Sequence, residues 1–363
     1  MREAVRAFTD RLLGRGSAAI TVPVMDGALK ANRVLDEAEV AVTLPGIDDI
    51  ASDGATLWAS AGRVLHRIEG GSAVPAQSFD ADISAIAASP GGRLAVATGG
   101  TRVRVMQADA EAWRDVAALD RLAGAPFVCV NALAFEGEDT LVFSDGSRQN
   151  GPEAWCRDLM ELGRSGRAGR WSIGSGTATE LAHGLHYAYG VLPRDGATLV
   201  SESWRHRVVA IAGPGHGPVL AELPCYPSRM TPAAEGGFWL ACFVCRTQLV
   251  EFVLREPAYR QRMLVEVDPR YWIAPTLSSG HSFLEPLQGA GVKSMGVLKP
   301  WAPPRSYGLV LRVGADGRIA GSLHSQVDGR HHGITGIAEH RGRLYAASKG
   351  SGRLLAVSTK LAP

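Results

Sequence analysis

Residues 333–348 read Gly-Ile-Thr-Gly-Ile-Ala-Glu-His-Arg-Gly-Arg-Leu-Tyr-Ala-Ala-Ser. Apolar alternation, a polar turn with Gly342 and a second short stretch ending in small residues predict a β-hairpin. The same phrase recurs five more times, starting at Asp49, Ser84, Asn131, Gly190 and Arg229. A repeat every roughly 35 to 60 residues is typical of propeller blades of four short strands. Six copies predict an all-β, six-bladed propeller, with a β-sandwich of chance internal similarity as the alternative.

The composition is that of a turn-rich globular protein, with 363 residues, 43 glycines and a net charge of +2. There is no basic run with interleaved aromatic residues, so the sequence gives no indication of nucleic-acid binding. No stretch approaches the roughly 20 apolar residues of a membrane span. The charged start, Met1 to Arg6, lacks the apolar core of a signal peptide and favours a cytoplasmic location.

The five cysteines do not suggest a disulfide framework, because their number is odd and their spacing irregular. Cys242 and Cys245 have the Cys-x-x-Cys spacing, but they fall on an expected strand, where side chains three apart point to opposite faces. We therefore expect buried thiols, with a zinc or redox pair as the alternative.

The propeller is expected over residues 46–363, preceded by an N-terminal segment, 1–45. Residues 1–15 form a short amphipathic helix candidate that either packs on the rim or docks a protein partner. Residues 19–24, Ala-Ile-Thr-Val-Pro-Val, are expected to complete the last blade and close the ring.

Two insertions interrupt the repeats, at 146–170 and 255–307. The second lies in blade five and begins with a helical pattern over 257–267. Long irregular segments in a compact ring are usually lids or interaction surfaces. A lid-like role is expected for the second, and four of its residues either roof a pocket or simply pack: His281, Phe283, Lys293 and Trp301.

Several segments carry a likeness to a known family: 143–147, 157–161, 222–227 with 237–241, 307–312 with Asp316-Gly317, and the hairpin 333–348. Together they resemble strictosidine synthase-like proteins over about residues 45 to 358. The resemblance implies a six-bladed propeller related to gluconolactonases and paraoxonases. It also implies a calcium or similar ion in the central channel, held by residues that open the innermost strands.

The family's ion ligands are only partly matched. Asp48, followed by Asp49, falls at an acidic ligand position, and Asn131 matches a ligand asparagine. Tyr189 replaces a ligand asparagine of blade four, and Ser228-Arg229 replaces the usual Asp-Asn of blade five.

The position of the catalytic glutamate of true strictosidine synthases corresponds to Thr335. A Pictet–Spengler condensation is therefore not expected. Asp49, Tyr189, Ser228, Arg229 and Thr335 are instead candidates for contact with a substrate.

Arg229 decides how the channel is interpreted. A guanidinium is always charged and has no lone pair, so it repels a dication and cannot ligate it. We expect Arg229 to replace the metal by pairing with Asp48 or Asp49, because a buried carboxylate needs a partner. The alternatives are that Arg229 turns outward while a weak Ca²⁺ ion binds, or that it receives the carboxylate of an acidic ligand.

Three histidines are candidates for a general base: His331 and His332, which precede the innermost strand of blade six, and His186, before blade four. With Asp48 and Asn131 as ligands or polarising groups, the leading hypothesis is hydrolysis of a small ester or lactone in the channel. The competing hypothesis is a non-catalytic propeller that binds a small molecule or a protein partner.

Overall fold

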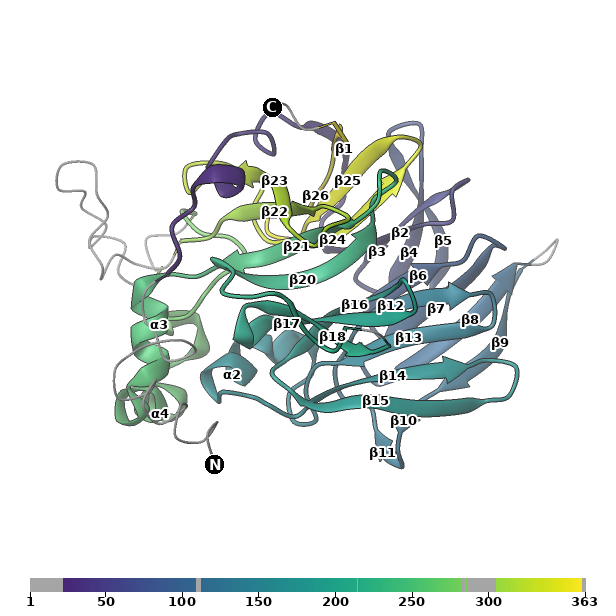
Figure 1. Cartoon of the computed structure of the whole chain (residues 1–363), viewed down its shortest axis with the longest axis horizontal. Helices are drawn as coiled ribbons and strands as arrows, with labels where there is room; N and C mark the ends of the chain where they lie inside the picture. The colour runs from purple at the N-terminus through teal and green to yellow at the C-terminus, as the bar shows by residue number, and fades with distance from the viewer. Residues whose placement is uncertain (1–21, 109–111, 214, 282–284, 286–304, 361–363) are drawn as a thin grey trace.

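The computed structural model describes residues 22–108, 112–213, 215–281, 285 and 305–360 (Figure 1). It contains six four-stranded sheets, and neighbouring strands in each sheet run antiparallel. The innermost strands β2, β6, β12, β16, β20 and β24 contact one another in this sequence, and β24 contacts β2 again. The ring is therefore closed, and the expected six-bladed propeller is confirmed.

Each blade is built from strands that follow one another along the chain, except the last. The first three blades are β2 (Ile47–Ser52), β3 (Leu57–Ala61), β4 (Val64–Glu69), β5 (Ser72–Ser78); β6 (Ile83–Ala88), β7 (Arg93–Thr98), β8 (Arg102–Ala108), β9 (Trp113–Leu119); and β12 (Val130–Gly137), β13 (Thr140–Asp145), β14 (Gly166–Ser172), β15 (Thr177–Leu185). The others are β16 (Ala188–Arg194), β17 (Ala197–Glu202), β18 (Arg207–Ala212), β19 (Gly217–Leu220); β20 (Cys225–Pro232), β21 (Phe238–Cys245), β22 (Gly308–Val313), β23 (Ile319–Ser325); and β24 (Ile334–His340), β25 (Arg343–Ser348), β26 (Arg353–Ser358), β1 (Glu39–Thr43). A small hairpin, β10 (Arg121–Leu122) with β11 (Ala125–Pro126), lies between the second and third blades.

The ring closes through β1, which pairs antiparallel with β26, so that Glu39 faces Ala356 and Thr43 faces Arg353. The expected closing strand at 19–24 was wrong: residues 19–21 lie outside the described part, and residues 22–24 are not in a strand. Pro23 has no N–H to donate to a ladder, which disfavours a strand there. Val42 of β1 is buried in an apolar cluster between the last and first blades.

Small residues let the inner strands converge on the axis. A Cβ atom at Gly190 of β16 would lie 2.3 Å from the carbonyl oxygen of Ser228 in β20. Real Cβ atoms essentially never come this close to a backbone atom, so glycine is required where these two blades meet.

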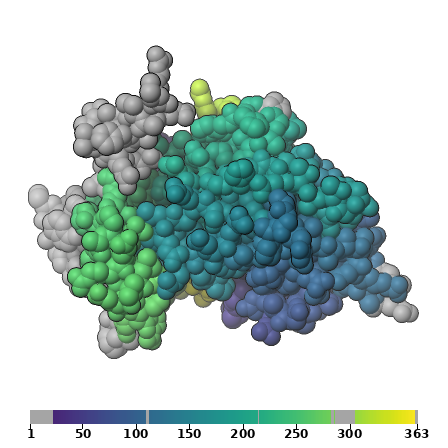
Figure 2. All heavy atoms as spheres, turned by 90° about the horizontal axis from the view of Figure 1, so that it is seen from below, coloured from purple at the N-terminus to yellow at the C-terminus, as the bar shows by residue number. Residues whose placement is uncertain are grey.

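In the described part of the chain, helices lie only in connections between strands, apart from one short turn that precedes the first strand. The first insertion holds η3 (Pro152–Ala154) and α2 (Trp155–Met160), and the second holds α4 (Pro257–Glu266) and η5 (Pro269–Tyr271). α3 (Gln248–Arg255) follows β21 and ends where the second insertion was expected to begin, so the chain leaves the blade earlier than predicted. Short 3₁₀ turns elsewhere are η2 (Gly27–Leu29) and η4 (Ser203–Arg205). Figure 2 shows α3 and α4 as a lobe at one side of the blades. None of the helices in the described ranges is long and apolar enough to cross a membrane.

The helix expected at 1–15, together with Phe283, Lys293 and Trp301, lies outside the described residues. His281 is described and exposed, and its backbone N–H donates to Glu285. The helical pattern at 257–267 is confirmed as α4. A lid-like role for the blade-five insertion stays a prediction.

The cysteine thiols lie largely in the core, as expected. Cys129, Cys225, Cys242 and Cys245 are buried and Cys156 is half-buried. Burial raises the pKa of the Cys242 thiol well above its ordinary value, and that of Cys245 as well. A thiol that resists ionisation is a poor nucleophile and a poor metal ligand.

Candidate functional site

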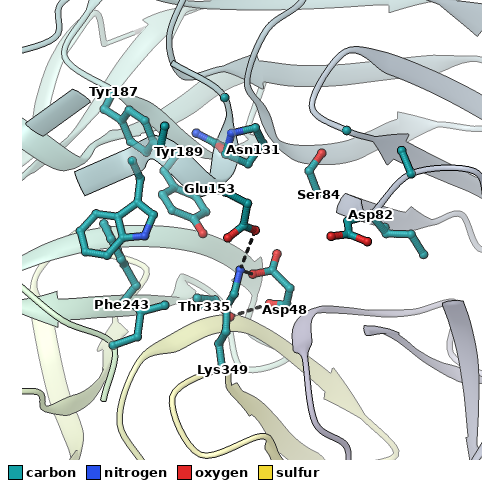
Figure 3. Close-up of a pocket in the computed structure, with 18 of the residues that line it drawn as sticks. Asp48, Asp82, Ser84, Asn131, Glu153, Tyr187, Tyr189, Phe243, Thr335 and Lys349 are labelled. Atoms are coloured by element: carbon teal, nitrogen blue, oxygen red, sulfur yellow. Dashed lines mark hydrogen bonds and ion pairs between the residues drawn. The ribbon is translucent and has the colours of Figure 1, made fainter. Parts of the chain in front are cut away.

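Two cavities lie along the propeller axis. The larger has a volume of about 360 Å³, and we call it the aromatic cavity. It is lined by Asp48, Asn131, Thr335 and Lys349 among the polar residues and by Trp155, Tyr187, Tyr189, Phe243 and Leu277 among the apolar ones (Figure 3). The other, the opposite cavity, has a volume of about 250 Å³, and Asp49 and Arg229 are among its lining residues.

The channel residues share a local backbone feature. Each innermost strand loses its regular register at the point where it supplies a channel residue. The irregularities fall between Ile47 and Ile50, Ile83 and Ala85, Val130 and Ala132, Ala188 and Val191, Pro227 and Met230, and Ile334 and Gly336. A bulge leaves backbone groups out of the ladder and re-aims a side chain. The six bulges therefore present free carbonyl groups and polar side chains to the axis.

The Arg229 guanidinium fills this ring of bulges. Its hydrogen bonds run from Nε to Asn131 O (3.0 Å), from Nη1 to Asp48 O (3.1 Å) and Thr335 O (3.1 Å), and from Nη2 to Asp48 Oδ2 (2.9 Å) and Ser84 O (2.6 Å). Arginine has five N–H donors, so all of them are used. Nε also lies 3.1 Å from Asp49 Oδ2, and the guanidinium carbon lies 5.2 Å from the Tyr189 ring centre. One side chain from β20 thus contacts the innermost strands of the five other blades.

Arg229 was expected to pair with Asp48 or Asp49, and the structure shows it paired with both, at 2.9 Å for Asp48 and 3.1 Å for Asp49. Because Arg229 contacts residues of both cavities, its guanidinium separates them. It does not turn outward, and it has no free N–H to offer a ligand carboxylate.

The two aspartates differ in their electrostatics. Burial opposes ionisation of Asp48, but Lys349 and Arg229 outweigh it and lower the pKa of Asp48 to about 2. Burial raises the pKa of Asp49 to about 6, because the attraction of Arg229 and the Ile86 N–H offsets it only in part. Burial opposes the charge of Arg229 too, yet Asp49 and Asp48 raise its pKa. The channel centre therefore carries a fixed cation.

The oxygens around the axis do not fit a calcium ion in this arrangement. Calcium takes six to eight oxygen ligands, and here the aspartates and four carbonyls already face a cation. The Asn131 side chain is also engaged, since Nδ2 donates to Ala188 O and Oδ1 accepts from Cys129 Sγ. Within the described ranges, no group of three or more His, Cys, Asp or Glu side chains is placed to hold a metal.

Lys349 is a cavity residue that sequence reasoning missed. It follows β25, and its Nζ lies 2.9 Å from Asp48 Oδ1 and 3.6 Å from Glu153 Oε1 (Figure 3). The attraction of Asp48 outweighs burial and raises the pKa of Lys349, so the side chain stays an ammonium. The sequence feature that could have identified Lys349 is the small-residue run Ala346-Ala347-Ser348, because it ends the hairpin at the channel and the next side chain lies there.

An aromatic wall forms the other side of the aromatic cavity. Tyr187 and Tyr189 come from blade four and Phe243 from blade five, while Trp155 comes from the first insertion. The rings contact edge-on or tilted, with centres 5.2 Å apart for both Trp155–Phe243 and Tyr189–Phe243. The cavity therefore has charged residues on one side and aromatic rings on the other.

The expected base histidines lie elsewhere. Nδ1 of His332 bonds Ser306 Oγ at 2.6 Å, and its Nε2 bonds Gln326 O at 2.7 Å. His331 is buried, with Nδ1 3.4 Å from Ser351 Oγ. His186 is half-buried, and burial lowers its pKa to about 4. None of the three is among the residues that line either cavity.

The other sequence candidates divide between the cavities. Asp48, Asn131, Tyr189 and Thr335 line the aromatic cavity. Ser228 lines neither one, since it is fully buried and its hydroxyl bonds Ala241 O at 3.0 Å and Ile334 O at 3.2 Å.

The chain is similar to known proteins in two respects, part of its sequence and its fold. No family model matches the chain. Protein STRICTOSIDINE SYNTHASE-LIKE 10 of Arabidopsis thaliana is 30% identical over 157 residues, 39% of this chain and 42% of that protein. The resemblance to strictosidine synthase-like proteins is confirmed. A second strictosidine synthase-like protein of the same plant, number 13, is 29% identical over 143 residues, 38% of this chain and 36% of the relative. The chain thus spans about two fifths of the length of the strictosidine synthase-like relatives it matches.

Solved structures show the same fold at low sequence identity. A gluconolactonase of Xanthomonas campestris has a TM-score of 0.56 at 14% identity, over 93% of this chain and 95% of that one. A luciferin-regenerating enzyme has a TM-score of 0.52 at 12% identity, over 90% and 94%. At these identities the likeness concerns the fold alone. The replacement of the catalytic glutamate by Thr335 stays a prediction from the motifs.

Proposed function

We propose that this propeller binds a small organic molecule in the aromatic cavity and does so without a metal ion, with Arg229 in the structural place of the ion. The observation that carries the proposal is the saturation of the guanidinium by five hydrogen bonds at the channel centre. A cavity of about 360 Å³ with an apolar wall and a few polar groups is in the range of small-molecule sites.

Hydrolysis of a small ester or lactone is the second candidate. Lys349 favours hydrolysis, because a largely buried ammonium can stabilise the negative charge that develops on a substrate's carbonyl oxygen. The base would then be Glu153, a carboxylate on the same cavity, rather than a histidine. The gluconolactonases of similar fold make lactones the first compounds to test.

The metal question is tested by thermal unfolding with excess calcium and with chelator. A ligand that binds only the native state at a hundredfold excess over its dissociation constant adds ~2.7 kcal/mol of stability. We expect the same midpoint in both conditions. A calcium-dependent rise that disappears in Asp48→Ala would overturn the metal-free proposal.

The catalytic question is tested with a panel of lactones and aryl esters. Turnover by the wild type that is lost in Lys349→Met and in Glu153→Gln would establish the hydrolase. A panel without turnover, combined with binding of panel compounds to the aromatic cavity, would leave the binding function alone.

A further inference from the structure

Two hydrogen-bond donors in the aromatic cavity have unused capacity. The Lys349 ammonium has three N–H groups, and Asp48 Oδ1 at 2.9 Å takes one. Glu153 Oε1, at 3.6 Å, lies beyond hydrogen-bond distance. The Tyr189 hydroxyl, which points toward the same polar cluster, has no hydrogen-bond partner among the described residues (Figure 3). These donors are suited to an acceptor oxygen from outside the chain.

Glu153 shows which kind of acceptor approaches Lys349. Arg229 and Lys349 together balance the charges of Asp48 and Asp49 at the channel floor. Glu153 adds a third carboxylate beside Lys349, on a side chain that is 82% exposed. An exposed carboxylate at a loose distance can be displaced by another one with little loss, because such ion pairs contribute little.

The apolar wall adds a second requirement. Trp155 and Phe243 border the same cavity as Lys349, so a molecule whose charged end reaches the ammonium has its body beside these rings. Burying an apolar or aromatic body there stabilises the complex in proportion to the area removed from water.

We propose that the cavity takes a small carboxylic acid with an apolar or aromatic body, whose carboxylate displaces Glu153 and binds Lys349 and the Tyr189 hydroxyl. The body lies against Trp155 and Phe243. This inference rests on the proposed function and names the class of ligand for the same site.

The test uses three probes of one shape, phenylacetate, phenylacetamide and 2-phenylethylamine, titrated into the protein of 363 residues by calorimetry. Phenylacetate is expected to bind tightest. Lys349→Met should weaken it by at least about tenfold, because a charge-assisted bond is lost. Glu153→Gln should tighten it about twofold to fivefold, because a competing carboxylate is removed.

Arg262→Met is the matched control, since Arg262 of α4 is 75% exposed, does not line the cavity, and its loss changes the net charge equally. It should change phenylacetate affinity less than twofold. If Lys349→Met does not fold, Tyr189→Phe serves in its place, with an expected loss of about threefold to tenfold.

Several results would overturn the inference: tightest binding of the amine, equal binding of all three probes, weaker phenylacetate binding in Glu153→Gln, or no binding of any probe. The proposed function survives the first three, because a small molecule still binds. It fails with the inference only if a general fragment panel also shows no binding to the cavity.

Discussion

Arg229→Met removes the cation at the channel centre with little change in side-chain length. Four backbone carbonyls lose a donor. Asp48 keeps Lys349 at 2.9 Å, whereas Asp49 keeps only the backbone N–H groups of Ile50 and Ile86, each at 2.9 Å. Breaking one side of a buried ion pair costs about 3–5 kcal/mol. With an unfolding entropy of about 2.1 cal/mol/K per residue, a chain of 363 residues shifts by about 1.3 °C per kcal/mol, so the thermal midpoint should fall by roughly 4–7 °C.

The assay is scanning calorimetry at neutral pH, with Arg343→Met as the control. Arg343 pairs with Glu39 at 2.6 Å, but both side chains are exposed, so its loss should leave the midpoint almost unchanged. In Arg229→Met the Asp49 carboxylate and four carbonyls face the channel without the guanidinium, so calcium should stabilise this variant and not the wild type. A variant within about 2 °C of the wild type would refute the reasoning, because no buried charge could then have been left unpaired.

Three further predictions concern the frame around the site. The pKa of Asp49 is raised to about 6 in the folded protein, so the stability that its protonation contributes is present below pH 4 and is lost as the pH rises to 6. Asp49→Asn should abolish this loss when thermal unfolding midpoints are measured from pH 4 to 7. Gly190→Ala should destabilise the protein by about 1–3 kcal/mol in urea, and an unchanged midpoint would show that the blades can separate there. Arg167→Met leaves the fully buried Asp145 without its partner at 2.9 Å and should cost about 3–5 kcal/mol, whereas a loss below about 1 kcal/mol would contradict the pairing.

Most of the fold could be predicted from the periodic recurrence of the hairpin pattern in the sequence. The repeated phrase gave the number of blades, because each copy is one inner hairpin whose alternation survives in the structure. The closing strand was misplaced because 19–24 and 39–43 are both short apolar stretches. Pairing with β26 is a contact across the whole chain, which local pattern does not encode.

Those contacts in the channel that follow from charge alone could be predicted from the sequence. A permanent cation among carboxylates must pair, so Arg229 with Asp48 and Asp49 followed from residue chemistry. Lys349 and Glu153 did not follow, because Lys349 lies in the turn after β25 and Glu153 in η3 of the first insertion, and the local sequence pattern does not show where these segments lie relative to the channel. The histidines precede the innermost strands as expected. However, proximity in sequence to a channel strand does not decide which way a ring turns, and the ring nitrogens of His332 bond neighbouring loops instead.

The position of Arg229 also has a consequence for the path a ligand takes. A guanidinium held by the strands of every blade blocks the axis between the two cavities, so a molecule in the aromatic cavity does not pass along the axis into the opposite one. A molecule therefore enters and leaves on the side of Arg229 where Trp155 of the first insertion lines the cavity. Exchange is then governed by the side chains on that side of Arg229, and a smaller residue at Trp155 should speed dissociation, because the body of the proposed ligand packs against its ring.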